Sequence, residues 1–135
     1  MTPADVVVRY FREVWERGDV DLLDELLADD FVDHDPPPGY PPDATGHRRL
    51  AADMVAMMAD RRYTLECVDT DGDCVSVRYE ATWTQVGGFF GRPADGLELT
   101  LRGRDRYRIP AGRITESWHV QELAHTSART RPPSR

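Results

Sequence analysis

The sequence predicts a single α+β domain in which three helices pack against one curved antiparallel sheet. Through the first 61 residues, apolar side chains recur at the spacing of an α-helix. After Arg62 they alternate with polar side chains, which is the pattern of strands with one buried face. A chain of 135 residues is long enough for one hydrophobic core and too short for two.

Caps and breakers divide the N-terminal half into three helices. Thr2 caps the first helix and Gly18 ends it. The apolar stripe of this helix consists of Val7, Tyr10, Phe11, Val14 and Trp15. Asp19 caps a second helix, and a third runs from Thr45 to about Arg61. Residues 36–42, which include five prolines, can form neither a helix nor a central strand, so we expect a stiff loop at the rim of the domain.

Four strands follow in the C-terminal half. The turn at Asp71-Gly72 joins the first two, and residues 87–93 then break the alternation. Two further strands, over residues 97–109 and 113–122, are joined by a turn at Ala111-Gly112. We assign residues 1–123 to the domain. The remaining residues, 124–135, have no apolar face and are expected to form a flexible tail.

Charge and composition argue against several classes of protein. The formal net charge is −7, whereas nucleic acids and anionic membranes bind clustered positive charge. The sequence has no run of 18 apolar residues and no basic segment leading into an apolar run at its N-terminus. Cys67 and Cys74 form neither a disulfide framework nor a zinc-type spacing. We therefore expect a cytoplasmic protein with no nucleic-acid or membrane partner.

Carboxylates interrupt the apolar faces of the last two strands. Asp105 falls on a face that otherwise carries Leu, Tyr and Ile, and Glu116 and Glu122 fall on the face of Trp118. A two-residue turn at 111–112 pairs Asp105 with Trp118, roughly 7 Å from Glu116 and roughly 13 Å from Glu122. Burying an unpaired carboxylate costs several kcal/mol, so these acids predict an internal polar pocket. The alternative is that Asp105 and Glu116 satisfy local backbone or tyrosine groups.

One histidine is a candidate for proton transfer. His34 lies between Asp33 and Asp35, where it can act as a base or hydrogen-bond donor at a pocket mouth. The alternative is a solvent-exposed loop histidine. Three adjacent residues rarely converge on one ion, so we predict no metal. Phosphate-binding loops, nucleophile elbows and zinc-type spacings are absent from the sequence, which leaves acid/base chemistry. We assign no chemistry to the other histidines, His47, His119 and His125.

Several short motifs follow one another in a recognisable order over about residues 5–122. They are Arg9-Tyr10-Phe11, Gly18-Asp19, Phe31 to Pro36, Gly46, Asp71-Gly72-Asp73, Gly87 to Gly91, Gly103-Arg104-Asp105 and Gly112 to Trp118. This order resembles the SnoaL-like polyketide cyclases of the nuclear-transport-factor-2-like superfamily. The resemblance implies a cone-shaped fold, often dimeric through its sheet, whose pocket binds polyketides or similar metabolites. It also implies aldol closure without cofactor or metal, by an acid four positions after the strand tryptophan, which is Glu122 here.

Ketosteroid isomerases share the cone and give a second resemblance. It implies a hydrogen-bonding role for Asp105 and a base role for Asp35. Together these features predict a cofactor-free cyclase or isomerase acting on a polyketide-like or other apolar, oxygenated metabolite. Glu122 is the expected acid/base, His34 assists it, and Asp105 donates a hydrogen bond to a developing enolate. The residues expected to contact the substrate are Tyr10, Trp83, Phe89, Phe90, Tyr107, Glu116 and Trp118.

Two other functions remain open from the sequence. One is an epoxide-opening hydrolase or cyclase that uses Glu122 and Asp105 with water. The other is a non-catalytic module that binds a small molecule, because a fold does not fix a function. We expect a homodimer formed through the sheet, as the family resemblance implies.

Overall fold

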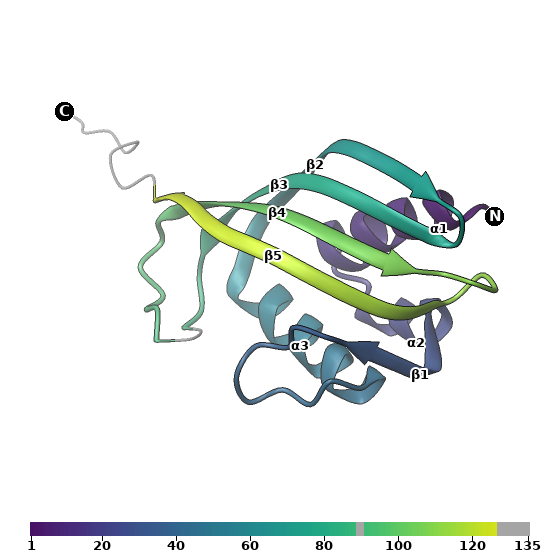
Figure 1. Cartoon of the computed structure of the whole chain (residues 1–135). Helices are drawn as coiled ribbons and strands as arrows, with labels where there is room; N and C mark the ends of the chain where they lie inside the picture. The colour runs from purple at the N-terminus through teal and green to yellow at the C-terminus, as the bar shows by residue number, and fades with distance from the viewer. Residues whose placement is uncertain (89–90, 127–135) are drawn as a thin grey trace.

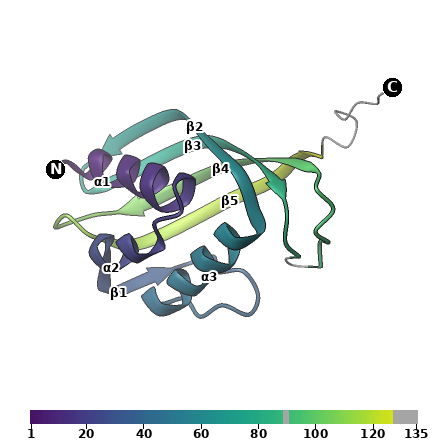
Figure 2. The same ribbon diagram turned by 180° about the vertical axis from the view of Figure 1, so that it is seen from behind.

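The computed structural model describes residues 1–88 and 91–126, which form a helical layer on one face of a single sheet (Figures 1 and 2). The helices are α1 (Pro3–Arg9), which continues into a π-helical segment (Tyr10–Glu16), α2 (Leu23–Leu26), which follows a short 3-10 turn (Val20–Leu22), and α3 (Ala44–Met57). The strands are β1 (Leu27–Asp33), β2 (Met58–Asp71), β3 (Cys74–Gln85), β4 (Glu98–Arg108) and β5 (Ile114–Thr126). This architecture confirms the predicted α+β class.

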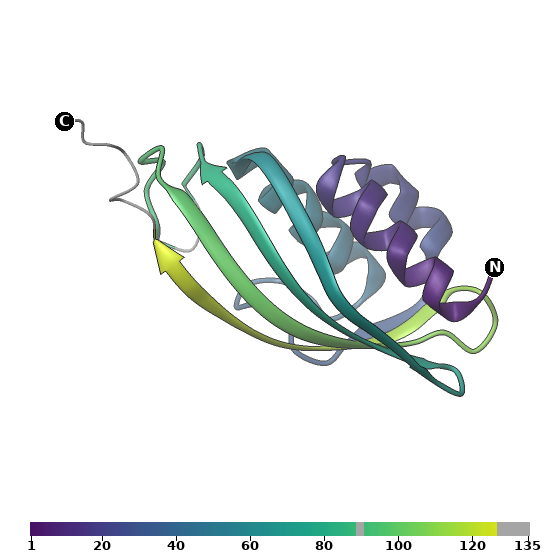
Figure 3. The same ribbon diagram turned by 90° about the horizontal axis from the view of Figure 1, so that it is seen from above.

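The sheet is open and strongly curved, with its strands in the order β1-β5-β4-β3-β2 (Figure 3). Strands β2 to β5 pair antiparallel, as predicted. Strand β1 was not predicted, and it pairs in parallel with β5. Its seven residues include three aspartates, and its register against β5 is irregular, so it carries little of the alternation by which a strand is recognised.

Local signals account for the first helix. The backbone amide of Asp5 donates to the Thr2 hydroxyl at 3.1 Å, and the Asp5 carboxylate accepts from the Thr2 amide at 3.0 Å. These two bonds form a capping box, which satisfies amides that have no partner inside the helix. The predicted stripe is buried and brings Tyr10, Phe11 and Val14 against the inner face of the sheet.

The third helix ends at Met57 rather than at about Arg61, because tertiary contacts replace its last turn. The amide of Val86 donates to the Met57 carbonyl at 2.9 Å, which joins this point to the end of β3. Asp60 then adopts a positive φ of 53°, which an α-helix does not allow. The guanidinium of Arg61 donates to the backbone carbonyl of Trp15 at 2.9 Å, so it anchors the new strand to the first helix.

The connection between β4 and β5 is longer than predicted and changes the register of the two strands. It covers residues 109–113 and pairs Asp105 with His119. The predicted pairing of Asp105 with Trp118 is therefore wrong by one residue. Because successive side chains of a strand point to opposite faces, this shift turns His119 toward the helices and Trp118 away from them.

The C-terminal strand continues beyond the predicted domain boundary. Strand β5 reaches Thr126, and the rest of the predicted tail lies outside the described residues. None of the helices in the described part of the chain is both long and apolar enough to cross a membrane.

Candidate active site

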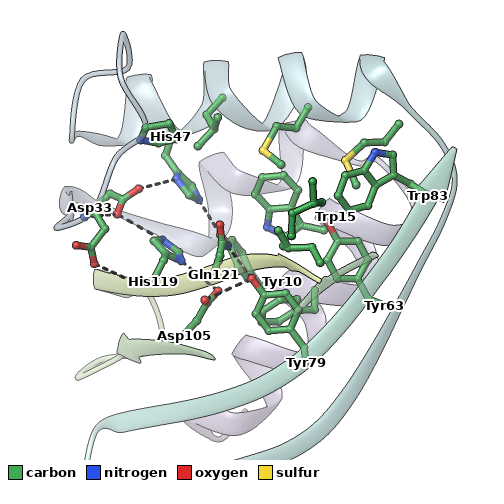
Figure 4. Close-up of a pocket in the computed structure, with 18 of the residues that line it drawn as sticks. Tyr10, Trp15, Asp33, His47, Tyr63, Tyr79, Trp83, Asp105, His119 and Gln121 are labelled. Carbon is green, nitrogen blue, oxygen red and sulfur yellow. Dashed lines mark hydrogen bonds and ion pairs between the residues drawn. The ribbon is translucent and has the colours of Figure 1, made fainter. Parts of the chain in front are cut away.

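A cavity of about 260 Å³ lies between the helical layer and the inner face of the sheet. Its lining is apolar where α3 faces Trp83, and polar where β1, β4 and β5 meet (Figure 4). The apolar part includes Leu50, Met54, Met57, Met58, Trp83, Leu99 and Leu101. The polar part includes Tyr10, Asp33, Asp35, His47, Tyr79, Asp105, Tyr107, His119 and Gln121.

His119 lies between two carboxylates at the polar end. Its Nε2 is 3.4 Å from Oδ1 of Asp33, and its Nδ1 is 3.1 Å from Oδ2 of Asp105. The three residues belong to β5, β1 and β4, and β5 is the strand between the other two. The order of the strands therefore brings together three side chains that are far apart in the sequence.

The electrostatics of this group favour an imidazolium held by carboxylates. Burial by itself lowers the pKa of His119, but the close contacts with Asp105 and Asp33 and the negative charges of these carboxylates outweigh burial and raise the pKa to about 10. Burial opposes ionisation of Asp33 as well, yet His119 and His47 hold the pKa of that carboxyl well below its ordinary value. At neutral pH, His119 is therefore charged and Asp33 is ionised.

Asp105 is surrounded by hydrogen-bond donors. The Tyr107 hydroxyl donates to Oδ2 at 2.6 Å, and the Tyr79 hydroxyl faces Oδ1 at 3.4 Å. The side-chain amide of Gln121 donates to the Tyr79 hydroxyl oxygen at 2.7 Å. Burial and the charge of Asp105 raise the pKa values of Tyr79 and Tyr107 well above their ordinary range, so both phenols stay protonated. In these surroundings Asp105 accepts hydrogen bonds, whereas the sequence analysis expected it to donate one to the substrate.

A second histidine joins the polar end from the helical layer. His47 of α3 lies with Nε2 at 2.7 Å from the Tyr10 hydroxyl and with Nδ1 at 3.7 Å from Oδ2 of Asp33. Its Nδ1 is buried and forms no hydrogen bond with any described residue. The rings of His47 and His119 are stacked with their centroids 6.4 Å apart. Within residues 1–88 and 91–126, no three His, Cys, Asp or Glu side chains are arranged to hold a metal ion.

The proline-rich loop fixes the end of β1 that carries Asp33. The Asp33 amide donates to the carbonyl of Pro42 at 2.7 Å, and the Asp35 amide donates to Oδ1 of Asp33 at 3.0 Å. The backbone amide of His119 in turn donates to Oδ2 of Asp35 at 2.9 Å. Asp35 therefore lies at the rim of the cavity with one carboxylate oxygen engaged by β5.

The comparison with known sequences places the chain in a family. The sequence model of the SnoaL-like polyketide cyclases matches residues 5–128. The chain belongs to this family. No protein of curated function matches it in sequence.

Solved structures agree with this family over most of the chain. IdmH from Streptomyces antibioticus, proposed to be a polyketide cyclase, is 29% identical, with 90% of this chain and 93% of that chain covered and a TM-score of 0.77. TsrD from Streptomyces laurentii is 22% identical, with 89% and 88% covered and a TM-score of 0.78. A SnoaL-like polyketide cyclase from Agrobacterium tumefaciens is 20% identical, with 90% and 92% covered and a TM-score of 0.74.

Some of the predicted site residues line the cavity of this SnoaL-like protein. They are Tyr10, Asp35, Trp83, Asp105 and Tyr107. Phe89 and Phe90, which were also predicted to contact the substrate, lie outside the described residues. The structure therefore brings Asp105 together with the predicted tyrosines Tyr10 and Tyr107 at the polar end of the cavity. Trp83 lies at the apolar end of the same cavity, and Asp35 lies at its rim.

Four other predicted residues lie outside the cavity. Glu116, Trp118 and the exposed Glu122 are on the outer face of the sheet, because the one-residue register shift inverts their strand. His34 is with them. Its Nε2 lies 2.9 Å from Oε1 of Glu116, and its ring stacks on Trp118 at 4.7 Å. The structure does not bring Glu122 or His34 near Asp105.

Sequence reasoning missed the roles of Asp33, His47 and His119. It named Asp33 only as a neighbour of His34, and it gave the two histidines no chemistry. His119 lies opposite Asp105 because the connection covers the five residues 109–113, whereas the sequence pattern predicted a turn of two residues. For His47 the local pattern gave no signal, because its partner Tyr10 is 37 positions away in the sequence.

Proposed function

We propose that this SnoaL-like protein is an acid/base cyclase that closes a ring in a polyketide-like substrate by an intramolecular aldol reaction. The observation that carries the proposal is the row Asp105, His119 and Asp33 at the polar end of an otherwise apolar cavity. General acid/base catalysis requires a positioned proton acceptor, and a cation held beside it by a second carboxylate can stabilise the charge that the proton transfer creates.

Oδ1 of Asp105 is the proposed base atom. Oδ2 is engaged by Tyr107 and His119, whereas Oδ1 has the long 3.4 Å contact with Tyr79. In the proposed reaction, Oδ1 removes a proton from the carbon beside a ketone. The resulting enolate carbon attacks a second carbonyl carbon of the same molecule, and the new alkoxide takes the proton back from Asp105. Atoms and electrons balance within the substrate, so the step requires no oxidant or reductant.

His119 and Asp33 support this proton transfer. As the proton moves to Asp105, negative charge moves onto the substrate, and the neighbouring, largely buried imidazolium stabilises that charge. Asp33 is a weak proton acceptor, because the pKa of its carboxyl is lowered. Its proposed role is to hold the His119 ring in place.

The shape and lining of the cavity support an apolar, oxygenated substrate. Methionine, leucine and tryptophan side chains surround most of the space, and the polar groups gather at one end. This arrangement is typical of sites that bury an apolar body and orient it through a few polar contacts. The likeness to IdmH, which is proposed to be a polyketide cyclase, supports the same class of substrate.

The test is the turnover of an aryl-substituted 1,5-diketone, whose aldol closure gives a β-hydroxycyclohexanone. Loss of water from this product then gives a conjugated cyclohexenone that absorbs in the ultraviolet. We expect Asp105→Asn to lower kcat by about 10²- to 10⁴-fold, because the amide cannot accept the proton. Exchange of deuterium from solvent into the carbon beside the ketone should fall in parallel. Normal turnover by Asp105→Asn would refute the assignment.

Glu122→Gln is the matched control, since it makes the same chemical change on the outer face of the sheet. We expect its kcat to stay within about twofold of the wild type. A large loss of kcat with Glu122→Gln and none with Asp105→Asn would instead assign the acid/base role to Glu122, as the sequence analysis expected. Binding of the diketone with neither deuterium exchange nor closure would favour the non-catalytic alternative.

A further inference from the structure

Aldol closure requires a hydrogen-bond donor at the ketone that becomes the enolate, in addition to a base. We propose that Tyr79 is this donor, and that Gly103 and Gln121 position it beside Asp105. This inference rests on the proposed function and adds a catalytic residue to it. Three features carry the inference: the gap at Gly103, the bond from Gln121 and the long contact with Asp105.

Gly103 leaves a gap in the inner face of the sheet through which Tyr79 reaches across. Tyr79, Gly103 and Gln121 are directly opposite one another on β3, β4 and β5. A Cβ atom built on Gly103 would lie 2.4 Å from Cζ and 2.5 Å from the hydroxyl oxygen of Tyr79. Neighbouring strands are about 4.8 Å apart, so the missing side chain lets the phenol extend over β4 to a residue two strands away.

Gln121 determines where the Tyr79 proton points. Its side-chain amide donates to the Tyr79 hydroxyl oxygen at 2.7 Å, so the hydroxyl hydrogen must be directed elsewhere. The acceptor in reach is Oδ1 of Asp105, the proposed base atom. The donor and the base are therefore held side by side, as a carbonyl oxygen and the hydrogen on the adjacent carbon require.

The contact between Tyr79 and Asp105 is long enough for a substrate oxygen to replace it. It measures 3.4 Å, whereas the Tyr107 hydroxyl lies 2.6 Å from the other oxygen of the same carboxylate. Hydrogen bonds between oxygens are usually about 2.7–2.8 Å long, so Tyr79 is weakly bound to Asp105 and Tyr107 is tightly bound. Tyr79 can thus turn its proton to the substrate while Tyr107 keeps the carboxylate in place.

Tyr79 acts as a neutral donor and does not lose its proton. Burial, followed by the charge of Asp105, raises the pKa of Tyr79 well above its ordinary value. Asp105 takes the proton from carbon, and the Tyr79 hydroxyl donates a hydrogen bond to the enolate oxygen, where negative charge develops. When the carbon–carbon bond forms and this oxygen becomes a ketone again, the hydrogen bond weakens, and Asp105 returns its proton to the new alkoxide.

The first experiment removes the hydroxyl. With the aryl-substituted 1,5-diketone, Tyr79→Phe should lower kcat by about 10²- to 10³-fold and change KM by less than about threefold, since the donor acts chiefly in the transition state. Tyr40→Phe is the matched control, because its hydroxyl donates to Asp53 at the surface and lies outside the cavity. A Tyr79→Phe variant with normal kcat, beside an inactive Asp105→Asn variant, would overturn the donor role and leave the base in place.

The second experiment tests whether Gly103 acts through Tyr79. Gly103→Ala should lower kcat in the wild-type background, because the new methyl group displaces the phenol. It should lower kcat no further in a Tyr79→Phe background, since the hydroxyl is already gone. Gln121→Leu should behave in the same way, because it removes the bond that orients the hydroxyl. If Gly103→Ala or Gln121→Leu lowers kcat as much in the Tyr79→Phe background as in the wild type, Gly103 and Gln121 do not act by positioning Tyr79.

The third experiment requires no turnover, so it separates this inference from the proposed reaction. The probe is 2-naphthol, whose oxygen on an aromatic ring imitates an enolate, and naphthalene is the same body without the oxygen. Tyr79→Phe should weaken 2-naphthol binding at least about tenfold and leave naphthalene binding unchanged. Equal effects on both ligands would overturn the donor role. If the preference for 2-naphthol depends on Tyr79 while the wild type closes no diketone, the donor stands and the aldol proposal fails.

Discussion

Raising the pH above neutrality should destabilise this protein through one residue, His119. The pKa of this imidazole is about 10 in the folded protein, against an ordinary value of 6.5. Between these two values the folded state keeps a proton that the unfolded state has lost. The free energy of unfolding therefore falls as the pH rises, and the contribution of His119 is fully present only below about pH 6.5.

The size of the effect follows from the protonation difference. One proton bound only in the folded state changes the free energy of unfolding by about 1.4 kcal/mol per pH unit. From pH 7 to pH 9 the loss due to His119 is therefore about 3 kcal/mol, a large part of the about 5–15 kcal/mol that stabilises a typical domain. The side chain of His119 is 13% exposed, so solvent screens its two ion pairs only weakly.

The assay is urea-induced unfolding, followed by tryptophan fluorescence at several values between pH 7 and pH 9.5. For the wild type, the free energy of unfolding should fall steeply as the pH rises. For His119→Gln, the slope of this free energy against pH should be shallower by about 1 kcal/mol per pH unit. The variant will be less stable at neutral pH, since it leaves Asp33 and Asp105 without their cation. Equal slopes for the two proteins would refute the assignment of a charged His119.

Three further substitutions test individual contacts of the fold by the same unfolding assay. Gly46→Ala should cost about 1–3 kcal/mol, since its Cβ would lie 2.1 Å from the carbonyl oxygen of Pro41, and full stability would show that the loop shifts freely. Thr2→Ala should cost about 1 kcal/mol through loss of the helix cap, and an unchanged midpoint would mean that the first turn holds without it. Tyr10→Phe should cost about 1–3 kcal/mol, because it leaves Nε2 of His47 buried without its partner, and a neutral effect would contradict that bond.

The local pattern was sufficient for most of the fold. The change from a helical period to alternation predicted the α+β class, and the Thr2 cap, the Asp71-Gly72 turn and the glycine-rich break predicted where elements begin and end. These features depend on residues close in the sequence, so they can be read without the tertiary structure. The homodimer through the sheet depends on a second chain and stays a prediction.

The site was predicted in part. The prediction was limited by an error of one residue in the register between β4 and β5. Asp105 was singled out because burying a carboxylate on an apolar strand face costs free energy unless it has a partner, and the structure does place it in the cavity. Its partners were predicted from a two-residue turn, and the actual connection over 109–113 shifts β5 by one position. Trp118 and Glu122 consequently lie on the outer face of the sheet, and His119 lies beside Asp105 where Trp118 was predicted.

The sequence by itself determined the three helical segments and the four antiparallel strands, and which of these strands carries a carboxylate on its apolar face. Only the tertiary structure decided that β1 pairs with β5, and that Asp33, His47 and His119 meet Asp105 in one cavity. The physical reason is the range of the interactions involved. Helix caps and periodicity act over a few residues, whereas strand order and register depend on how whole elements pack. Because the side chains of a strand alternate with a period of two, an error of one residue exchanges the inside of the protein for its surface.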